Sequence, residues 1–219
     1  MPRAALAVLF VAALALAPGA TANPPNKEQI RLNAVDQASA RAALLRRSDL
    51  GPSGWSGGPV KPDLSSTMSC PGYQPKQSDL VLTGVAEADF RHSGLSIQSS
   101  AQVLKTRSMV ALDWQRTVVA PKAFGCIRSM LTKGLLSNQR LVSFKKLPFP
   151  RLARYTAAYR ALIEFTSQGQ HVLVLADIVL VGRSRTELTL SLEAPAAARA
   201  SISQAEVRLA RGLLARVRA

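Results

Sequence analysis

The strongest constraint on the fold is an alternating pattern of apolar side chains in the C-terminal half of the chain. In the segment RYTAAYRALIEFT, every second residue is apolar or aromatic, namely Tyr155, Ala157, Tyr159, Ala161, Ile163 and Phe165. A second apolar segment, HVLVLADIVLVG, follows after the turn signal Ser167-Gln168-Gly169-Gln170. A period of two is typical of a strand with one buried face, and short Gly-containing turns join antiparallel strands. These residues predict a β-hairpin within an antiparallel sheet.

Other segments extend this sheet and supply helices to cover it. Strands are expected at TGVAEADFRH and LSIQSSAQVLKT, joined by Ser93-Gly94, and at QRLVSFKKL and RTELTLSLEA. Apolar residues at helical spacing predict helices over residues 26–47, over 107–120 up to Pro121, after Pro121, and from about Ser201 onward. Since each sheet face and helix stripe needs an apolar partner, the expected fold is α+β, an antiparallel sheet of about six strands packed with roughly two to four helices as an α/β sandwich.

The N-terminal residues predict an exported protein. Arg3 precedes a short apolar run, and Ala20-Thr21-Ala22 forms a small-x-small cleavage site before Asn23. The run is shorter than the roughly 20 residues that span a bilayer, which disfavours a membrane anchor. We therefore expect a signal peptide at 1–22, cleaved after Ala22, and a single secreted domain at 23–219 with no transmembrane segment. Within it, residues 48–76 are rich in Gly, Pro and Ser and are expected to form a long irregular loop.

The two cysteines of the chain, Cys70 and Cys126, fit this compartment. Export places them where disulfides persist, and two thiols allow a single intramolecular pairing. A Cys70–Cys126 disulfide is predicted, with two free buried thiols as the alternative. Its loop closure would stabilise the fold by roughly 4 kcal/mol on chain-entropy grounds.

Charge is the most unusual property of the composition. Loss of Arg3 with the signal leaves 27 basic against 13 acidic residues, a net charge of +14. No acidic residue lies between Asp113 and Glu164. A basic patch is predicted there, built from Arg140, Lys145, Lys146, Arg151 and Arg154. Such a field attracts polyanions, and outside the cytoplasm these are anionic cell-wall polymers, lipid head groups or acidic proteins rather than nucleic acid. A solvated surface that reflects composition alone is an equally good interpretation.

The stretch GWSGGP at residues 54–59 raises the question of a catalytic Ser56, because it fits the pattern G-x-S-x-G. In the chymotrypsin order the histidine precedes the serine, and no histidine lies upstream of Ser56. In the α/β-hydrolase order Asp113 and His171 could complete a triad, but the serine would have to lie between a strand and a helix of a parallel sheet. The better interpretation is a glycine-rich turn in which Trp55 covers an edge of the core.

Other chemical signals are weak. The two histidines, His92 and His171, lack neighbouring ligands at metal-binding spacing. The chain contains no P-loop, no dinucleotide-binding glycine motif and no H-E-x-x-H motif, so no cofactor is expected. Tyr155 and Tyr159 share one strand face, where core packing is the commoner role and ligand stacking the alternative.

The order of features resembles a group of exported actinobacterial domains. The matching residues are LLRRSDLGPSGW after the first helix, FGCIRSML, DIVLVGR and an Arg-rich last helix. The group includes the extracellular sensor domain of the kinase PknH and lipoproteins of the LpqN type, which are similar to Mog1/PsbP-like sandwiches. This chain has no lipobox cysteine, and it has one possible disulfide where the kinase sensor is expected to have two. The resemblance implies a non-enzymatic envelope module that binds or senses an unidentified ligand.

Overall fold

The computed structural model describes residues 26–51, 54–64, 68–167 and 169–217. The expected signal peptide therefore lies outside the described residues. Eight strands form one sheet in the order β1-β3-β4-β8-β7-β6-β5, and β2 pairs with β3. The strands are β1 (Gln29–Ile30), β2 (Ser56–Val60), β3 (Val81–His92), β4 (Leu95–Leu104), β5 (Gln139–Lys146), β6 (Tyr155–Ser167), β7 (Gln170–Arg183) and β8 (Thr186–Pro195). The predicted α+β fold with a largely antiparallel sheet is confirmed.

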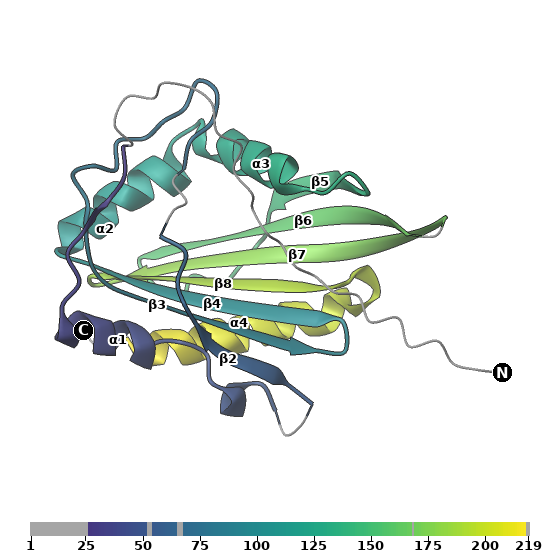
Figure 1. The fold of residues 1–219 in the computed structure, drawn as a ribbon, viewed down its shortest axis with the longest axis horizontal. Helices are drawn as coiled ribbons and strands as arrows, with labels where there is room; N and C mark the ends of the chain where they lie inside the picture. Colours follow the sequence, from purple (N-terminus) through teal and green to yellow (C-terminus); the bar gives the residue numbers. More distant parts are fainter. Residues whose placement is uncertain (1–25, 52–53, 65–67, 168, 218–219) are drawn as a thin grey trace.

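Helices cover both faces of this sheet (Figure 1). The lower face carries α1 (Ala34–Ala42) and α4 (Arg199–Ala215), and the upper face carries α2 (Arg107–Trp114), its π-helical continuation η2 (Gln115–Val119) and α3 (Ala123–Gly134). Two short 3₁₀ turns, η1 (Arg47–Asp49) and η3 (Ala196–Ala198), complete the described elements. Among the described residues, no helix has the length and apolarity needed to cross a bilayer.

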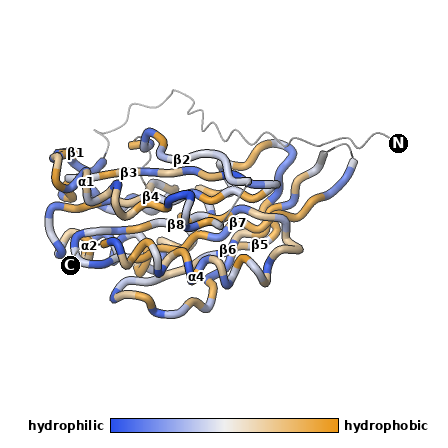
Figure 2. Tube along the Cα trace, turned by 90° about the horizontal axis from the view of Figure 1, so that it is seen from below, coloured by the Kyte–Doolittle hydropathy of each residue, from blue (hydrophilic) through white to orange (hydrophobic). Residues whose placement is uncertain are grey.

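The main core lies on the lower face. Alternating residues of the strands, such as Ala101, Val179 and Leu190, are buried there against Leu44 beyond α1 and Leu213 of α4. Hydrophobic and hydrophilic residues alternate along the strands, as Figure 2 shows by colour. The alternation sends the intervening side chains to the upper face, where only part of the strand length is covered by α2 and α3.

The predicted first helix is much shorter than expected. The residues before it form β1, which pairs in parallel with β3 through bonds from Gln29 N to Leu80 O (2.8 Å) and from Arg31 N to Leu82 O (2.8 Å). Asn33 then caps α1 by accepting a bond from Asp36 N at 2.9 Å. Helical spacing in the first eight residues of the predicted segment is thus overridden by an available strand edge and a strong N-cap.

The sequence predicts one long irregular loop over residues 48–76, but part of this segment is regular. The end of η1 and the whole of β2 lie within it. β2 pairs antiparallel with β3 from Ser56↔Arg91 to Val60↔Glu87. Gly57 makes this possible: its φ is +103°, and a Cβ there would lie 2.1 Å from the carbonyl oxygen of Asp89. The glycines of GWSGGP therefore serve close strand approach as well as turning.

Candidate functional site

A cavity of about 420 Å³ lies between the upper face of the sheet and the helices α2, η2 and α3. The sheet supplies its floor, the helices one wall, and two segments that precede β3 supply the other. The lining residues include Lys27, Glu28, Asp63, Gln77, Asp113, Trp114, Thr117, Ile127, Met130, Tyr159, Ile178, Leu180, Glu187 and Thr189. This volume falls in the range of small-molecule sites in proteins.

The floor is polar because β8 alternates. Leu188, Leu190 and Leu192 are buried in the lower core, so Glu187 and Thr189 point to the upper face. The neighbouring strand β7 instead presents apolar side chains to the cavity, including Leu180. The half of the floor formed by β8 is therefore polar, and the half formed by β7 and β6 is mainly apolar.

The helical wall has an acid, Asp113, within a stripe of mainly apolar side chains. Val110, Asp113, Trp114 and Thr117 occur at i, i+3, i+4 and i+7, the spacing that puts side chains on one helix face. All but Thr117 are buried. The next turn is π-helical, with Ala120 N bonded to Gln115 O at 2.9 Å, a form found frequently at functional sites.

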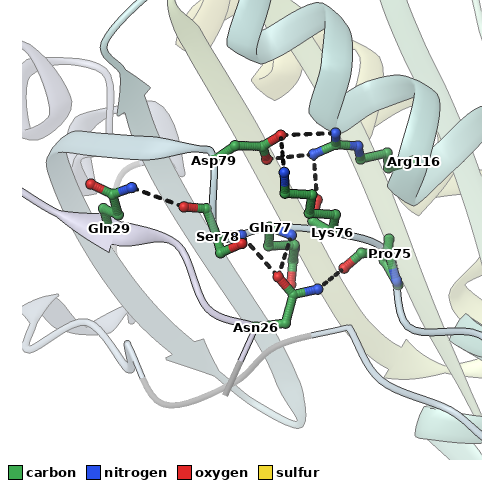
Figure 3. A network of polar contacts seen from close by, with 8 residues as sticks. All are labelled: Asn26, Gln29, Pro75, Lys76, Gln77, Ser78, Asp79 and Arg116. Atoms are coloured by element: carbon green, nitrogen blue, oxygen red, sulfur yellow. Dashed lines mark hydrogen bonds and ion pairs between the residues drawn. The ribbon is translucent and has the colours of Figure 1, made fainter. Parts of the chain in front are cut away.

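The second wall is the strap, defined as residues 61–64 and 68–80, and it is fastened at several points (Figure 3). The predicted Cys70–Cys126 disulfide is present and ties the strap to α3. Arg116 holds both oxygens of Asp79, at 2.7 and 3.1 Å. Asn26 donates to Pro75 O at 2.7 Å and accepts from Gln77 N at 3.0 Å. These bonds fix the position of the strap relative to η2 and α3.

Four side chains on the cavity have a buried polar atom without a hydrogen-bond partner among the described residues. These atoms are Gln77 Oε1, Asp113 Oδ1, Tyr159 Oη and Glu187 Oε1. Tyr159 is 1% exposed and Gln77 is 7% exposed. An unpartnered polar atom buried in a protein costs roughly 1–3 kcal/mol, so four on one cavity are unusual. They concentrate unused hydrogen-bonding capacity of the described residues on one cavity.

Burial dominates the titration of the acids in the cavity. It raises the pKa of Glu187 well above its usual range, and the nearby charge of Asp113 raises it further. The pKa of Asp113 is also raised by burial, although Glu187, Thr117 and Arg116 act in the opposite direction. Burial and then the charge of Asp113 raise the pKa of Glu28 to about 7. Each of the two acids therefore shifts the pKa of the other, and burial favours the protonated form of Glu187.

The predicted basic residues lie along one edge of the structure. Arg140, Lys145 and Lys146 are exposed on the edge strand β5, and Arg151 and Arg154 are exposed in the segment before β6. Arg140 pairs with Glu164 at 2.7 Å, and Arg154 lies over the ring of Tyr155. Residues 155 and 164 are nine positions apart in β6, about 30 Å along a strand. The five residues are not gathered into one patch, and their role in binding stays a prediction.

The residues of the serine hypothesis lie apart. The Ser56 hydroxyl donates to Arg91 O at 3.3 Å, Asp113 lies in the cavity, and His171 contacts Glu164 at the far end of β7. Trp55 donates from Nε1 to Leu50 O at 3.0 Å, and its ring packs against the lower core and beside His92. The structure does not bring the three groups of a triad together.

Sequence reasoning missed the acidic cavity. Asp113 was considered only as a triad member, although an acid within the stripe Val110, Trp114, Val118 was a visible signal. Glu187 lies in the predicted strand RTELTLSLEA, but the sequence prediction does not single it out. Of the two tyrosines, Tyr159 is both a core residue beside Phe144 and a cavity residue. Because the acids come from distant segments, only the fold could bring them together.

No known protein family and no curated protein matches the chain. Among solved structures, it is similar to an uncharacterized protein of Mycobacterium smegmatis, an ortholog of Rv0999, at 14% identity over 84% of this chain and 98% of that chain, with a TM-score of 0.46. A protein of unknown function from Pseudomonas aeruginosa is similar at 14% identity over 53% of this chain and 82% of that chain, with a TM-score of 0.28. Neither is described as a PknH sensor or an LpqN lipoprotein, so the resemblance to those domains stays a prediction.

Proposed function

We propose that this chain is an exported, non-catalytic binding domain of the cell envelope, and that its ligand occupies the upper-face cavity. The single observation that carries the proposal is the set of four buried polar atoms without partners around one 420 Å³ space. A bound molecule would supply those partners and remove their cost. The resemblance to exported sensor domains points in the same direction.

The two acids lie together on the cavity. Each shifts the pKa of the other, and both line the same space. Two neighbouring carboxyls suit recognition of one polar group of a ligand.

A cavity-filling substitution tests the site. Ile178 and Val172 both lie on the upper face of β7, but Ile178 lines the cavity and Val172 is exposed beyond it. Protein purified from envelope extract should retain a small molecule in native mass spectrometry, and Ile178→Trp should lose it. Val172→Trp should retain it. Retention of the same mass by Ile178→Trp would contradict the proposal, and so would the absence of any retained mass in the wild type.

Export is tested separately. The mature protein should begin at Asn23 when its N-terminus is sequenced from an extracytoplasmic fraction of expressing cells. A chain that starts at Met1 and stays in the cytoplasmic fraction would refute this part of the proposal while leaving the cavity untouched.

A second candidate function, binding of anionic polymers or lipid head groups, is favoured by a different hollow. Arg107, Arg154 and Arg183 line it at the end of the sheet beneath α2, and no acid is among its described lining residues. Arg154→Gln should weaken binding to anionic vesicles in low salt, whereas Arg140→Gln should have less effect because Arg140 is paired with Glu164. Vesicle binding that does not weaken as the salt concentration rises would exclude this candidate, and so would equal effects of the two substitutions.

A further inference from the structure

The cavity is acidic in a strongly basic protein. Its described lining residues include four acids, Glu28, Asp63, Asp113 and Glu187, and a single base, Lys27. The whole sequence has the opposite balance, with 28 basic and 13 acidic residues. Such local reversal of charge is not explained by composition. It gives the cavity a field that favours positive charge against the background of the molecule.

The nearby bases are committed elsewhere. Arg116 is the closest cation on the helical wall, and it holds Asp79 of the strap through both nitrogens. This pairing lowers the pKa of Asp79 to about 2. Lys27 is exposed, and no ion pair between it and Asp113 or Glu187 is found among the described residues. Arg116 also acts on Asp113 through its charge, but no base forms an ion pair with Asp113 or Glu187 among the described residues.

The rest of the cavity is suited to an apolar body. Trp114 and Leu180 lie on the wall and floor, and Ile127 and Met130 of α3 close the space above. Trp114 and Tyr159 also offer aromatic surfaces, which attract cations as well as apolar groups. Polar groups on one side and apolar groups on the other indicate a ligand with one polar end.

We infer that the cavity binds a cationic amphiphile, a small molecule with one primary or secondary ammonium group on an aliphatic or aromatic body. The ammonium group lies between Asp113 and Glu187 and donates to the unpartnered oxygens Oδ1 and Oε1. The body lies against Trp114 and Leu180. This inference rests on the proposed function, because it names the ligand class of the same cavity.

Binding of such a ligand is coupled to loss of a proton. In the free protein burial and the charge of Asp113 raise the pKa of Glu187 well above its usual range, which favours the protonated form of Glu187. When an ammonium group enters, that proton leaves to solvent and both carboxylates face the cation. Other charged or titratable groups around the pair are Glu28, Asp63, Lys27, Arg116, Tyr73 and Tyr159. Glu28 titrates nearby with a pKa of about 7, so part of the proton release comes from it.

Three probes of nearly equal size test the inference. They are 2-phenylethylamine, 2-phenylethanol and phenylacetate, which differ in the charge of one end. A Trp55→Phe background leaves Trp114 as the single tryptophan, and its emission then reports occupancy of the cavity. The amine should bind best at pH 7, the alcohol more weakly and the anion least. Calorimetry in buffers of different ionisation enthalpy should show proton release with the amine alone.

Glu187→Gln and Glu193→Gln form a matched pair of variants. Both residues lie on the upper face of β8, but Glu193 lies outside the cavity. Loss of a charged hydrogen-bonding partner should weaken amine binding by about tenfold to a hundredfold in Glu187→Gln and leave it unchanged in Glu193→Gln. Amine affinity in the wild type should also rise with pH between about 5 and 8, a dependence that Glu187→Gln should reduce.

The outcomes separate this inference from the proposed function. If the alcohol or the anion binds as tightly as the amine, or if both variants behave alike, the cavity is a binding site but not a cation site. If no probe changes the emission of Trp114 and Ile178→Trp retains the natural ligand, the cavity is not the binding site and both proposals fail. Amine preference that is lost only in Glu187→Gln supports both.

Discussion

Carboxylates are buried on both faces of the same sheet, but only one face supplies a cation to them. On the lower face Arg160 lies opposite Asp177 in neighbouring strands and donates to both of its oxygens, from Nε at 2.6 Å. Both residues are almost completely buried, at 3% and 1% exposed. On the upper face Asp113 and Glu187 act on each other's pKa, and no hydrogen-bond donor contacts Asp113 Oδ1 or Glu187 Oε1 among the described residues.

The difference shows that the fold can place an arginine where a buried acid needs one. The Arg160–Asp177 pair also contacts Ser203 of α4, and Glu206 beside it stays protonated because burial raises its pKa to about 9. That cluster is covered by α4, although Glu206 Oε1 has no hydrogen-bond partner among the described residues. The upper-face pair opens into a cavity. We interpret the first as part of the packed core and the second as a site that awaits a ligand.

The largest effect is expected from breaking the pair on the lower face. Arg160→Met leaves Asp177 buried without its cation, which should lower the free energy of unfolding by about 3–5 kcal/mol in denaturant titrations. The double variant Arg160→Met/Asp177→Leu removes both charges and should recover much of the loss. A single variant as stable as the double one would show that the pair is not a core element.

The cross-link is expected to matter next, and mainly on the upper face. Cys70→Ser/Cys126→Ser releases a loop whose ends are 56 residues apart, which costs about 4 kcal/mol at most on chain-entropy grounds. Because the strap loses its tether to α3, hydrogen exchange should increase at residues 68–80 more than in α4. Uniform loss of protection across both faces would contradict this division.

The sequence predicted the sheet and the C-terminal helix better than the cavity. Alternation in β6 and β8, the apolar run in β7 and the spacing of Leu209, Leu213 and Val217 were enough to predict a sheet with a C-terminal helix. These signals are local, because they depend on one element burying one face. The hairpins β3–β4 and β6–β7 were likewise marked by their turn residues.

The cavity could not be predicted in the same way. Glu28, Asp113 and Glu187 are separated by more than 70 residues along the chain, and nothing in their neighbouring residues indicates that they meet. Short elements also escaped detection, because β1 has two residues and β2 begins inside a glycine-rich turn. Both depend on the exposed edge of β3, which exists only in the folded sheet.

A smaller effect is expected where the lower core reaches the GWSGGP stretch. Trp55→Ala removes a ring that packs against that core and a bond to Leu50 O, so it should lower stability by about 2–3 kcal/mol. Ser56→Ala removes an exposed hydroxyl bonded to Arg91 O and should cost less than about 0.5 kcal/mol. Similar, negligible effects in thermal unfolding would show that Trp55 does not belong to the core.

The smallest expected effect is a gain in stability, because the buried Glu187 on the upper face destabilises the folded protein. The folded-state pKa of Glu187 is raised above its ordinary value of 4.5, so between these values the folded protein holds a proton that the unfolded chain has lost. Stability therefore falls as pH rises through this window. Glu187→Gln removes the cost and should stabilise the free protein by about 1 kcal/mol at pH 8, and by less at pH 5.

This gain separates a binding residue from a packing residue. Replacement of a side chain that serves packing is expected to lower the free energy of unfolding. Replacement of Glu187 is expected to raise it and, at the same time, to abolish ligand binding. Glu206 titrates in the wild type and the variant alike, so its contribution cancels when the two unfolding curves are compared at each pH. Glu193→Gln, outside the cavity, is the control for ligand binding alone, because burial also raises the pKa of Glu193. If Glu187→Gln is instead destabilised at pH 8, the two faces of the sheet do not differ as proposed, and Glu187 is a structural residue like Asp177.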